Sequence, residues 1–371
     1  MKHSLLHSPT LAACGLALLA GCGTATVDSA AGAGPLRAAP VEAALATESF
    51  GWVLTGNQLL LTDDAGASFR DAGLKLPTQA RTAFFADADH GWAAALAGPR
   101  SVAVARTADG GRNWQTSTVP TKTEVGGLHL SFGDANRGLL LARTRTSSNF
   151  SAAEIFATEN GGATWRARPA TVAGEITLAR DGRAWLTGGA AGDELYSSDD
   201  QGRHWTRARL SFAAPVDSAA VAPPAAGLLP VTVVRGGRSQ LALLSTADGA
   251  RNWREVKSVP VREPTGPGAR VPAAATTAGP VVVDALGGTL LRTAGGADEK
   301  APATVATSHA AGLPAGVVTV DFAGQRAGWA LASDGSCRSG KTDCTRTTTV
   351  VATRDGGATW RMLLRWQARV G

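Results

Sequence analysis

The chain has 371 residues, of which 36 are Lys or Arg and 30 are Asp or Glu, so its formal net charge is +6. Hydrophobic residues make up 44% of the chain and charged residues 18%, a balance that excludes a disordered polyelectrolyte. No apolar run reaches the roughly 18 residues that a membrane-spanning helix needs, so we expect a soluble, folded body. The basic excess is arginine scattered along the chain, which argues against a nucleic-acid-binding arm.

The N-terminal segment has the layout of a processing signal. Lys2 supplies a positive start, residues 11–19 a short apolar core, and Leu19-Ala20-Gly21-Cys22 a small-residue site that ends in cysteine. This layout resembles the lipobox of bacterial lipoproteins. The resemblance implies that residues 1–21 are a signal peptide, that Cys22 is lipidated, and that the protein is anchored to a bacterial membrane on its extracytoplasmic side. An ordinary secretory signal with a chance cysteine is the alternative.

Residues 22–41 are rich in Ala, Gly, Pro and Ser and lack periodicity, so we expect a lipidated flexible tether there and a folded body over residues 42–371. Of the four cysteines, Cys14 leaves with the signal and Cys22 carries the lipid, so Cys337 and Cys344 remain. In an oxidising compartment these two are predicted to form a disulfide. Their spacing closes a small loop with Ser339 and Gly340 at its tip, a shape that a hairpin can bridge.

An octapeptide, here called the box, recurs through the body. Thr or Ser, Asp or Asn, Gly and Trp occupy positions one, three, five and eight at residues 107–114, 158–165, 198–205 and 353–360. Weaker copies at 62–69 and 246–253 have Phe69 in place of the tryptophan and Ala250 in place of the glycine. The third position holds Asp64, Asp109, Asn160, Asp200, Asp248 and Asp355, and the eighth holds Trp114, Trp165, Trp205, Trp253 and Trp360.

The box resembles the Asp-box, the repeat of bacterial neuraminidases. Its side-chain carboxylate can accept hydrogen bonds from turn amides, its glycine permits a left-handed backbone, and its tryptophan packs against the sheet. The resemblance implies a structural role and leaves catalysis open, because the same turn occurs in sialidases, other glycosidases, receptor ectodomains and binding propellers.

Strand-like segments surround each box. Pairs such as Gly51-Trp52, Gly91-Trp92 and Gly328-Trp329 open an apolar run upstream, and another strand-like run precedes each pair. The order strand, Gly-Trp strand, strand, box, short strand predicts a four-stranded antiparallel blade. Six boxes, with a seventh unit at 271–307 whose box has decayed, predict an all-β, seven-bladed β-propeller.

This combination most resembles the propellers related to the photosystem II assembly and stability factor, which implies a binding protein rather than an enzyme. The first blade begins with its own inner strand near Glu42, and the last ends with residues 361–366. We therefore expect no strand exchange at the seam of the ring, closure by packing alone, and Trp366 beside the seam.

A sialidase-like glycoside hydrolase is the alternative function. Sialidases use a tyrosine nucleophile with a glutamate partner, an aspartate acid/base and three arginines that bind a carboxylate. The single tyrosine, Tyr196, is expected on a third strand, remote from the central channel, which favours a packed structural role. Nine of the ten tryptophans fall in boxes or on second strands, leaving only Trp366 as a sugar platform.

Other motifs add no catalytic site. Residues 335–342 fit the phosphate-loop pattern G-x-x-x-x-G-K-[ST], but the strand-like residues 345–351 follow where a helix is required, so we predict no nucleotide binding. We predict no metal and no cofactor, since the histidines of the body are isolated in sequence: His90, His129, His204 and His309. The predicted function is binding of a protein or acidic ligand on one propeller face, through arginine.

Overall fold

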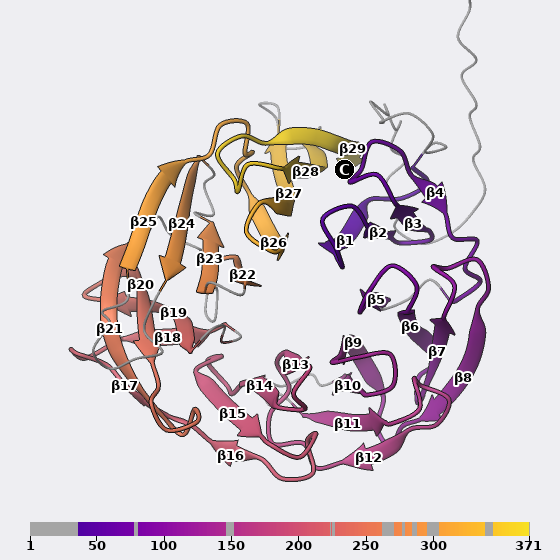
Figure 1. The fold of residues 1–371 in the computed structure, drawn as a ribbon, viewed down its shortest axis with the longest axis horizontal. Helices are drawn as coiled ribbons and strands as arrows, with labels where there is room; N and C mark the ends of the chain where they lie inside the picture. Colours follow the sequence, from indigo (N-terminus) through magenta and orange to yellow (C-terminus); the bar gives the residue numbers. More distant parts are fainter. Residues whose placement is uncertain are drawn as a thin grey trace, which may run out of the picture.

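The structure, a computed structural model, describes residues 36–77, 81–145, 152–222, 224, 227–261, 271–276, 279–283, 288–294, 304–337 and 344–370. It confirms the all-β, seven-bladed propeller: seven antiparallel sheets stand around a central axis (Figure 1). Strand order within each sheet runs from the axis to the rim. The described residues include no helix that is long and apolar enough to span a membrane.

The blades follow the chain. Blade 1 comprises β1 (Pro40–Leu45), β2 (Gly51–Thr55), β3 (Leu59–Thr62) and β4 (Arg70–Asp71). Blade 2 comprises β5 (Thr82–Phe85), β6 (Gly91–Gly98), β7 (Ser101–Thr107) and β8 (Gln115–Pro120). Blade 3 comprises β9 (Val125–Phe132), β10 (Gly138–Thr144), β11 (Ala153–Thr158) and β12 (Arg166–Arg168). Blade 4 comprises β13 (Ile176–Leu178), β14 (Ala184–Gly188), β15 (Glu194–Ser198) and β16 (Thr206–Arg207).

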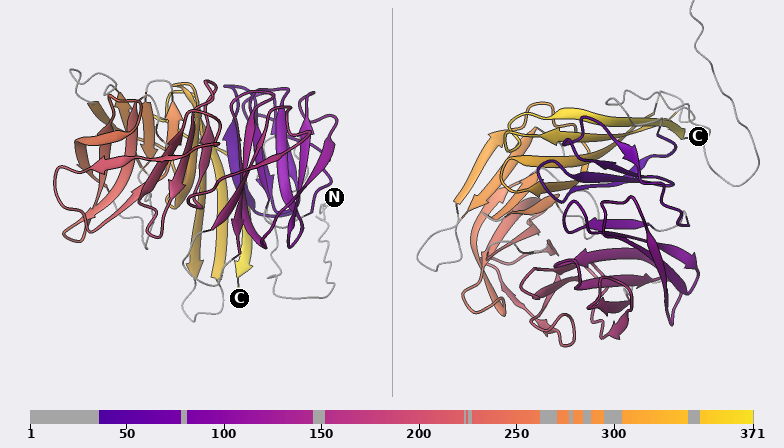
Figure 2. Two further views of the ribbon diagram at one scale, coloured as in Figure 1. Left: turned by 90° about the horizontal axis from the view of Figure 1, so that it is seen from below. Right: turned by 45° about the vertical axis from the view of Figure 1, so that its right-hand side comes forward.

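The second half of the ring contains three further blades. Blade 5 comprises β18 (Ser218–Val221), β19 (Leu228–Arg235), β20 (Arg238–Ser245) and β21 (Asn252–Pro260), and β17 (Arg209–Ser211) joins its rim in parallel with β21. Blade 6 comprises β22 (Ala273–Thr276), β23 (Gly279–Val283), β24 (Thr289–Ala294) and β25 (Thr304–His309). Blade 7 comprises β26 (Val317–Ala323), β27 (Ala327–Cys337), β28 (Cys344–Thr353) and β29 (Arg361–Val370), and its long outer strands project beyond the ring (Figure 2).

Burial explains the apolar runs on the middle strands. Every residue of β2 and β3 is buried, because both faces of a blade pack against neighbouring blades, whereas the outer strand β8 is largely exposed. Aromatic residues fill the space between blades: Trp92 of blade 2 stacks on Phe132 of blade 3 with ring centroids 3.5 Å apart. The Gly-Trp pairs of the sequence therefore mark the core between blades.

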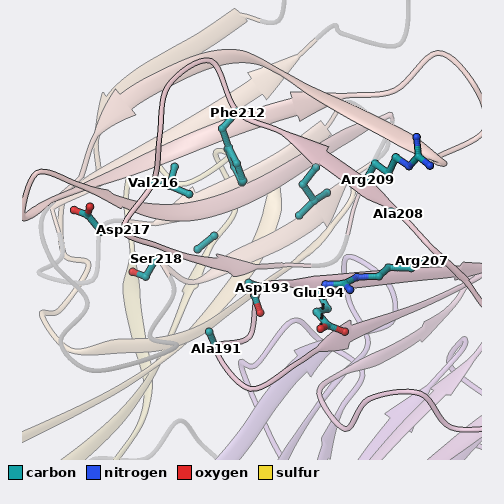
Figure 3. A pocket seen from close by; sticks show the side chains of 12 residues that line it. Ala191, Asp193, Glu194, Arg207, Ala208, Arg209, Phe212, Val216, Asp217 and Ser218 are labelled. Atoms are coloured by element: carbon teal, nitrogen blue, oxygen red, sulfur yellow. Dashed lines mark ion pairs between the residues drawn. The ribbon is translucent and has the colours of Figure 1, made fainter.

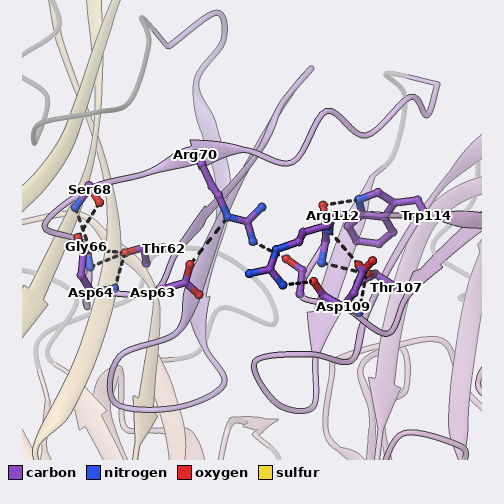
Figure 4. Close-up of polar contacts among 12 residues, drawn as sticks. Thr62, Asp63, Asp64, Gly66, Ser68, Arg70, Thr107, Asp109, Arg112 and Trp114 are labelled. Atoms are coloured by element: carbon purple, nitrogen blue, oxygen red, sulfur yellow. Dashed lines mark hydrogen bonds and ion pairs between the residues drawn. The ribbon is translucent and has the colours of Figure 1, made fainter.

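The box forms one compact turn, seen in blade 2 (Figure 4). The Thr107 hydroxyl oxygen accepts the Gly111 N–H at 2.9 Å, and the Asp109 carboxylate accepts the N–H groups of Asn113 at 2.9 Å and Arg112 at 3.0 Å. The backbone N–H and the side-chain amide of Asn113 lower the pKa of Asp109 to about 2. Both Gly110 (φ 69°) and Gly111 (φ 82°) are left-handed, so the turn needs two such residues in succession.

Box completeness does not determine tryptophan burial. Trp253 is 1% exposed although its box has Ala250, at φ 76°, in place of glycine. Trp114 and Trp165, from complete boxes, are only partly buried. All three make edge-on ring contacts, with Trp185, Phe85 and Phe132. Trp253 differs in having Leu210 of the added strand β17 as a neighbour as well.

The seam lies between blade 7 and blade 1, and no strand crosses it, as predicted. Leu45, Trp329 and Leu364 share one buried cluster there, with Trp366 packed against it. Closure by packing alone is wrong, however. The Asp321 carboxylate of β26 accepts the Leu45 N–H of β1 at 2.7 Å, so hydrogen bonding also closes the ring.

The packed body begins before Glu42. Leu36 is 3% exposed, and the Arg37 N–H donates to the Gln58 side-chain oxygen at 2.9 Å. Composition had assigned residues 36–41 to the tether, but Leu36 packs into the buried cluster at the seam, and Pro40 and Val41 belong to strand β1. The predicted signal peptide, Cys22 and the remaining tether lie outside the described residues.

The two body cysteines stand at the projecting end of blade 7. Cys337 and Cys344 are directly opposite each other where β27 pairs with β28, and cross-strand neighbours have Cβ atoms roughly 4.5–5.5 Å apart. The disulfide stays a prediction. Ser339, Gly340 and much of the phosphate-loop pattern lie outside the described residues, and residues 345–351 belong to strand β28, as predicted.

Candidate functional site

One type of hydrogen bond connects the rims of neighbouring blades. The carbonyl of the fourth box residue accepts a bond from a side chain of the preceding blade. Arg361 donates to Ala65 at 3.0 Å, Arg70 to Gly110, Trp92 to Gly161 at 2.8 Å, and Arg292 to Gly356 at 3.1 Å. These bonds join blade 7 to 1, 1 to 2, 2 to 3, and 6 to 7. Sequence analysis assigned arginine to ligand recognition, but these three arginines form hydrogen bonds between blades.

A second type of bond joins blades near the axis. A side-chain oxygen on the first or second strand of one blade accepts an N–H at the start of the next. Glu42 accepts from Ala83 at 3.3 Å, Ser131 from Leu178 at 2.9 Å, Thr232 from Val271 at 2.9 Å, and Asp321 from Leu45 at 2.7 Å. These bonds join blade 1 to 2, 3 to 4, 5 to 6, and 7 to 1.

Blades 4 and 5 are joined differently. Within the described part of the chain, their boundary contains neither type of bond. Strand β17 instead crosses from blade 4 to the rim of blade 5, where the Arg209 N–H donates to the Arg251 carbonyl at 2.8 Å. Elsewhere on the boundary, the Val221 N–H donates to the Gly192 carbonyl at 2.9 Å.

A cavity of about 640 Å³ opens at this boundary (Figure 3), and we call it the 4/5 cavity. Its volume is typical of ligand sites, roughly 300–1,000 Å³. Leu210, Phe212 and Val216 line it and pack against the buried cluster that contains Trp185 and Trp253. The cavity thus has an apolar wall supported by the core.

The loop that carries this wall is anchored at both ends. The Ala213 N–H donates to the Glu255 carboxylate at 3.0 Å, and the Asp217 N–H donates to the Val234 carbonyl at 2.8 Å. Glu255 forms an ion pair with Arg235, and their side chains are 5% and 15% exposed. The ion pair holds the Glu255 carboxylate in position, and this carboxylate in turn accepts the hydrogen bond from the loop. The loop and the cavity wall are therefore in place before any ligand binds.

Charged side chains form the rim of the 4/5 cavity (Figure 3). Arg207 pairs with Glu194 at 3.1 Å. Asp193 and Asp217 are exposed, and no described Lys, Arg or His lies within ion-pair distance of either carboxylate. The Asp217 carboxylate has only a long contact from the Gly237 N–H at 3.4 Å. Asp193, beside Glu194, and Asp217, at the end of the view away from Arg209, are therefore carboxylates of the rim without a cation among the described residues (Figure 3).

Tyr196 lies on β15, the third strand of blade 4, as predicted, and does not line the 4/5 cavity. Its hydroxyl donates to the Glu194 carboxylate at 2.9 Å, an arrangement that sequence analysis did not predict. Burial and this carboxylate raise the pKa of Tyr196, so the phenol stays protonated. Sialidases also use a tyrosine with a glutamate partner, but this pair lies on a third strand, away from the channel that the inner strands surround.

Two inner-strand carboxylates were also missed. Burial raises the pKa of Glu42 to about 7, although hydrogen bonds from Ala83 and Thr82 oppose the shift and nearby Asp321 adds to it. Burial also raises the pKa of Asp321. Both acids interrupt apolar strand sequences, PVEAAL and VVTVDFA, and that interruption is the pattern that could have indicated them.

The histidines show local contacts instead of a shared site. His90 contacts the Asp87 carboxylate at 3.0 Å, and His204 contacts its own box residue Asp200. Within the ranges that the structure describes, no group of three or more His, Cys, Asp or Glu side chains could hold a metal ion.

No protein-family model matches the chain, and no curated protein matches it in sequence. Several solved structures match its fold. Sqt1 of Saccharomyces cerevisiae has a TM-score of 0.51 at 9% identity, over 95% of this chain and 100% of that one. The uncharacterized protein lmo1340 of Listeria monocytogenes has a TM-score of 0.51 at 8% identity, over 91% and 98%. YCF48 bound to D1 peptide has a TM-score of 0.42 at 14% identity, over 91% and 83%. The similarities to Sqt1 and lmo1340 agree with the fold that the structure shows.

Proposed function

We propose that this chain is a non-enzymatic β-propeller that binds a protein or peptide ligand on the extracytoplasmic side of a bacterial membrane. The 4/5 cavity is the observation that supports ligand binding. Among the described residues, it lies at the blade boundary without either recurring bond, and part of its charged rim has no cation partner there; its apolar wall is preformed. The Asp-box and photosystem II factor resemblances support a scaffold of this kind.

An acidic ligand is less well supported than a protein ligand. That hypothesis assumed that the arginines have no structural role. Arg70, Arg292 and Arg361, however, donate hydrogen bonds to carbonyls of the next blade. Exposed arginines such as Arg112 and Arg251 remain on the rim. Binding of an acidic ligand through them would weaken steeply as salt rises, whereas binding in an apolar cavity would weaken little.

A sialidase-like hydrolase is the second candidate, because Tyr196 contacts Glu194. The test is an assay of the mature protein against fluorogenic sialosides, β-glucan and xyloglucan, with Tyr196→Phe as the control. We expect no turnover from either protein. Turnover by the wild type that disappears in Tyr196→Phe would replace the binding function with a glycosidase.

The membrane anchor follows from the lipobox resemblance. Fourteen peptide units separate Cys22 from Leu36, so the lipid would keep the propeller within roughly 50 Å of the membrane. Cys22→Ala is expected to abolish metabolic labelling with a lipid precursor and to release the protein from membranes. Persistent labelling and membrane retention of this variant would refute the anchor.

The predicted disulfide depends on the proposed extracytoplasmic location, because disulfides persist in oxidising compartments. Thiol titration of the mature, unfolded and unreduced protein is expected to find Cys337 and Cys344 unreactive, and to find both after reduction. Two reactive thiols before reduction would contradict both the bond and the compartment.

A further inference from the structure

We propose that the 4/5 cavity binds an extended peptide segment in which an apolar side chain is followed by lysine or arginine. This inference rests on the proposed binding function and specifies its ligand. Three features of the cavity carry it: the apolar wall, the unpaired carboxylates and the free edge of β17.

The apolar wall selects an apolar side chain. Leu210, Phe212 and Val216 are each only partly buried, so an entering side chain would remove their remaining apolar surface from water. The anchored loop holds this wall in place, since Ala213 and Asp217 are fixed by backbone hydrogen bonds. A preformed wall binds more tightly because little conformational entropy is lost on binding.

The charges select a cation at one end. Arg207 and Glu194 neutralise each other, which leaves Asp193 and Asp217 without a cation in the part of the chain that the structure describes. Arg209 lies toward the other end of the view in Figure 3, away from Asp217. A lysine or arginine directed toward Asp217 would gain an ion pair and would avoid Arg209, so the charges also fix the direction of the peptide (Figure 3).

The rim strand offers main-chain bonds. Strand β17 is the outermost strand of its sheet, and among the described strands it pairs with β21 alone, which leaves its other edge without a described partner. Its middle residue, Leu210, also lines the cavity. An extended peptide placed along this edge could pair with β17 while its apolar side chain enters the cavity.

The test is fluorescence anisotropy with three labelled hexapeptides that are identical except at two central positions. These positions hold Leu-Lys, Leu-Glu or Ser-Lys. We expect the Leu-Lys peptide to bind, and the other two to bind at least about tenfold more weakly, because each loses one of the proposed interactions.

Matched variants locate the binding. The double variant Asp193→Asn/Asp217→Asn should weaken Leu-Lys binding at least about tenfold, since it removes both rim carboxylates that could pair with the lysine. Asp63→Asn, which removes an exposed carboxylate from the blade 1 box, should leave binding unchanged. Arg209→Glu adds an acid at an exposed position and should improve binding of the Lys peptides. An unchanged denaturation midpoint confirms that each variant folds.

The outcomes separate this inference from the proposed function. Equal binding of all three peptides, binding insensitive to the cavity variants, or no binding would each overturn the peptide specificity. None of these results measures turnover, so none of them supports the glycosidase function. Only the assay with sialosides and glucans tests that function.

Discussion

Replacing Glu42 with glutamine is expected to remove most of the pH dependence of stability between pH 5 and 7. In the folded protein the pKa of Glu42 is raised from 4.5 to about 7, because the carboxyl group is buried between inner strands near Asp321. A raised pKa means that the folded state holds a proton that the unfolded state has released. The contribution of Glu42 to the stability of the wild type is therefore largest below pH 4.5. It is lost as the pH rises through 7.

The magnitude follows from the pKa difference. Each pH unit corresponds to about 1.4 kcal/mol, so the shift sets an upper limit of about 3 kcal/mol lost between pH 4.5 and 7. Asp321, whose pKa is also raised, changes stability in the same direction. The box aspartates contribute no slope here, since pKa values lowered to about 2, as at Asp109 and Asp355, matter only in acid.

Guanidinium chloride denaturation at pH 5, 6, 7 and 8 measures the effect. The amide oxygen of glutamine can still accept the Ala83 N–H, so Glu42→Gln should match the wild type at pH 5 and exceed it at pH 8. Glu159→Gln, which changes an exposed carboxylate, serves as the control. A wild-type midpoint that stays level from pH 5 to pH 8 would refute the burial of Glu42 in the inner ring.

Three further predictions, made with five substitutions, test the packing and the turns by chemical denaturation. Trp253→Ala should cost roughly 3–5 kcal/mol, and Trp114→Ala clearly less, because only Trp253 is fully buried; equal losses would contradict this. Arg361→Ala should cost about 1 kcal/mol by removing a seam hydrogen bond, whereas Arg112→Ala should cost under about 0.5 kcal/mol; no difference between them would refute the seam bond. Ala250→Gly should stabilise the protein by roughly 0.5–1 kcal/mol, because alanine is strained at φ 76°, and a loss of stability would show that the turn relaxes.

The repeating architecture could be predicted from sequence because the box is a local structure. Its hydrogen bonds join residues two to four positions apart, such as Thr107, Asp109, Gly111 and Asn113, so the spacing alone specifies the turn. The number of blades follows from counting boxes and the strand-like runs between them. Blade 6 was predictable without a box because its strands keep their apolar runs.

The connections between blades could not be predicted in the same way. Arg361 and Ala65 are 296 residues apart, and nothing in either box indicates that one reaches the other. The 4/5 cavity is harder still, since its lining joins residues of two blades and the strand β17 that runs between them. Likewise, the Glu42 pKa depends on burial by neighbouring strands, which a single sequence does not specify.

Hydrogen–deuterium exchange, with and without the Leu-Lys peptide, tests the central claim most directly. The claim is that ligand binds where blades 4 and 5 lack the bonds that join the other blades. Peptide is predicted to slow amide exchange in residues 207–218, which surround the 4/5 cavity, and to leave the blade 2 box at residues 107–114 unchanged. Protection confined to another blade boundary, or to the mouth of the central channel, would contradict the claim.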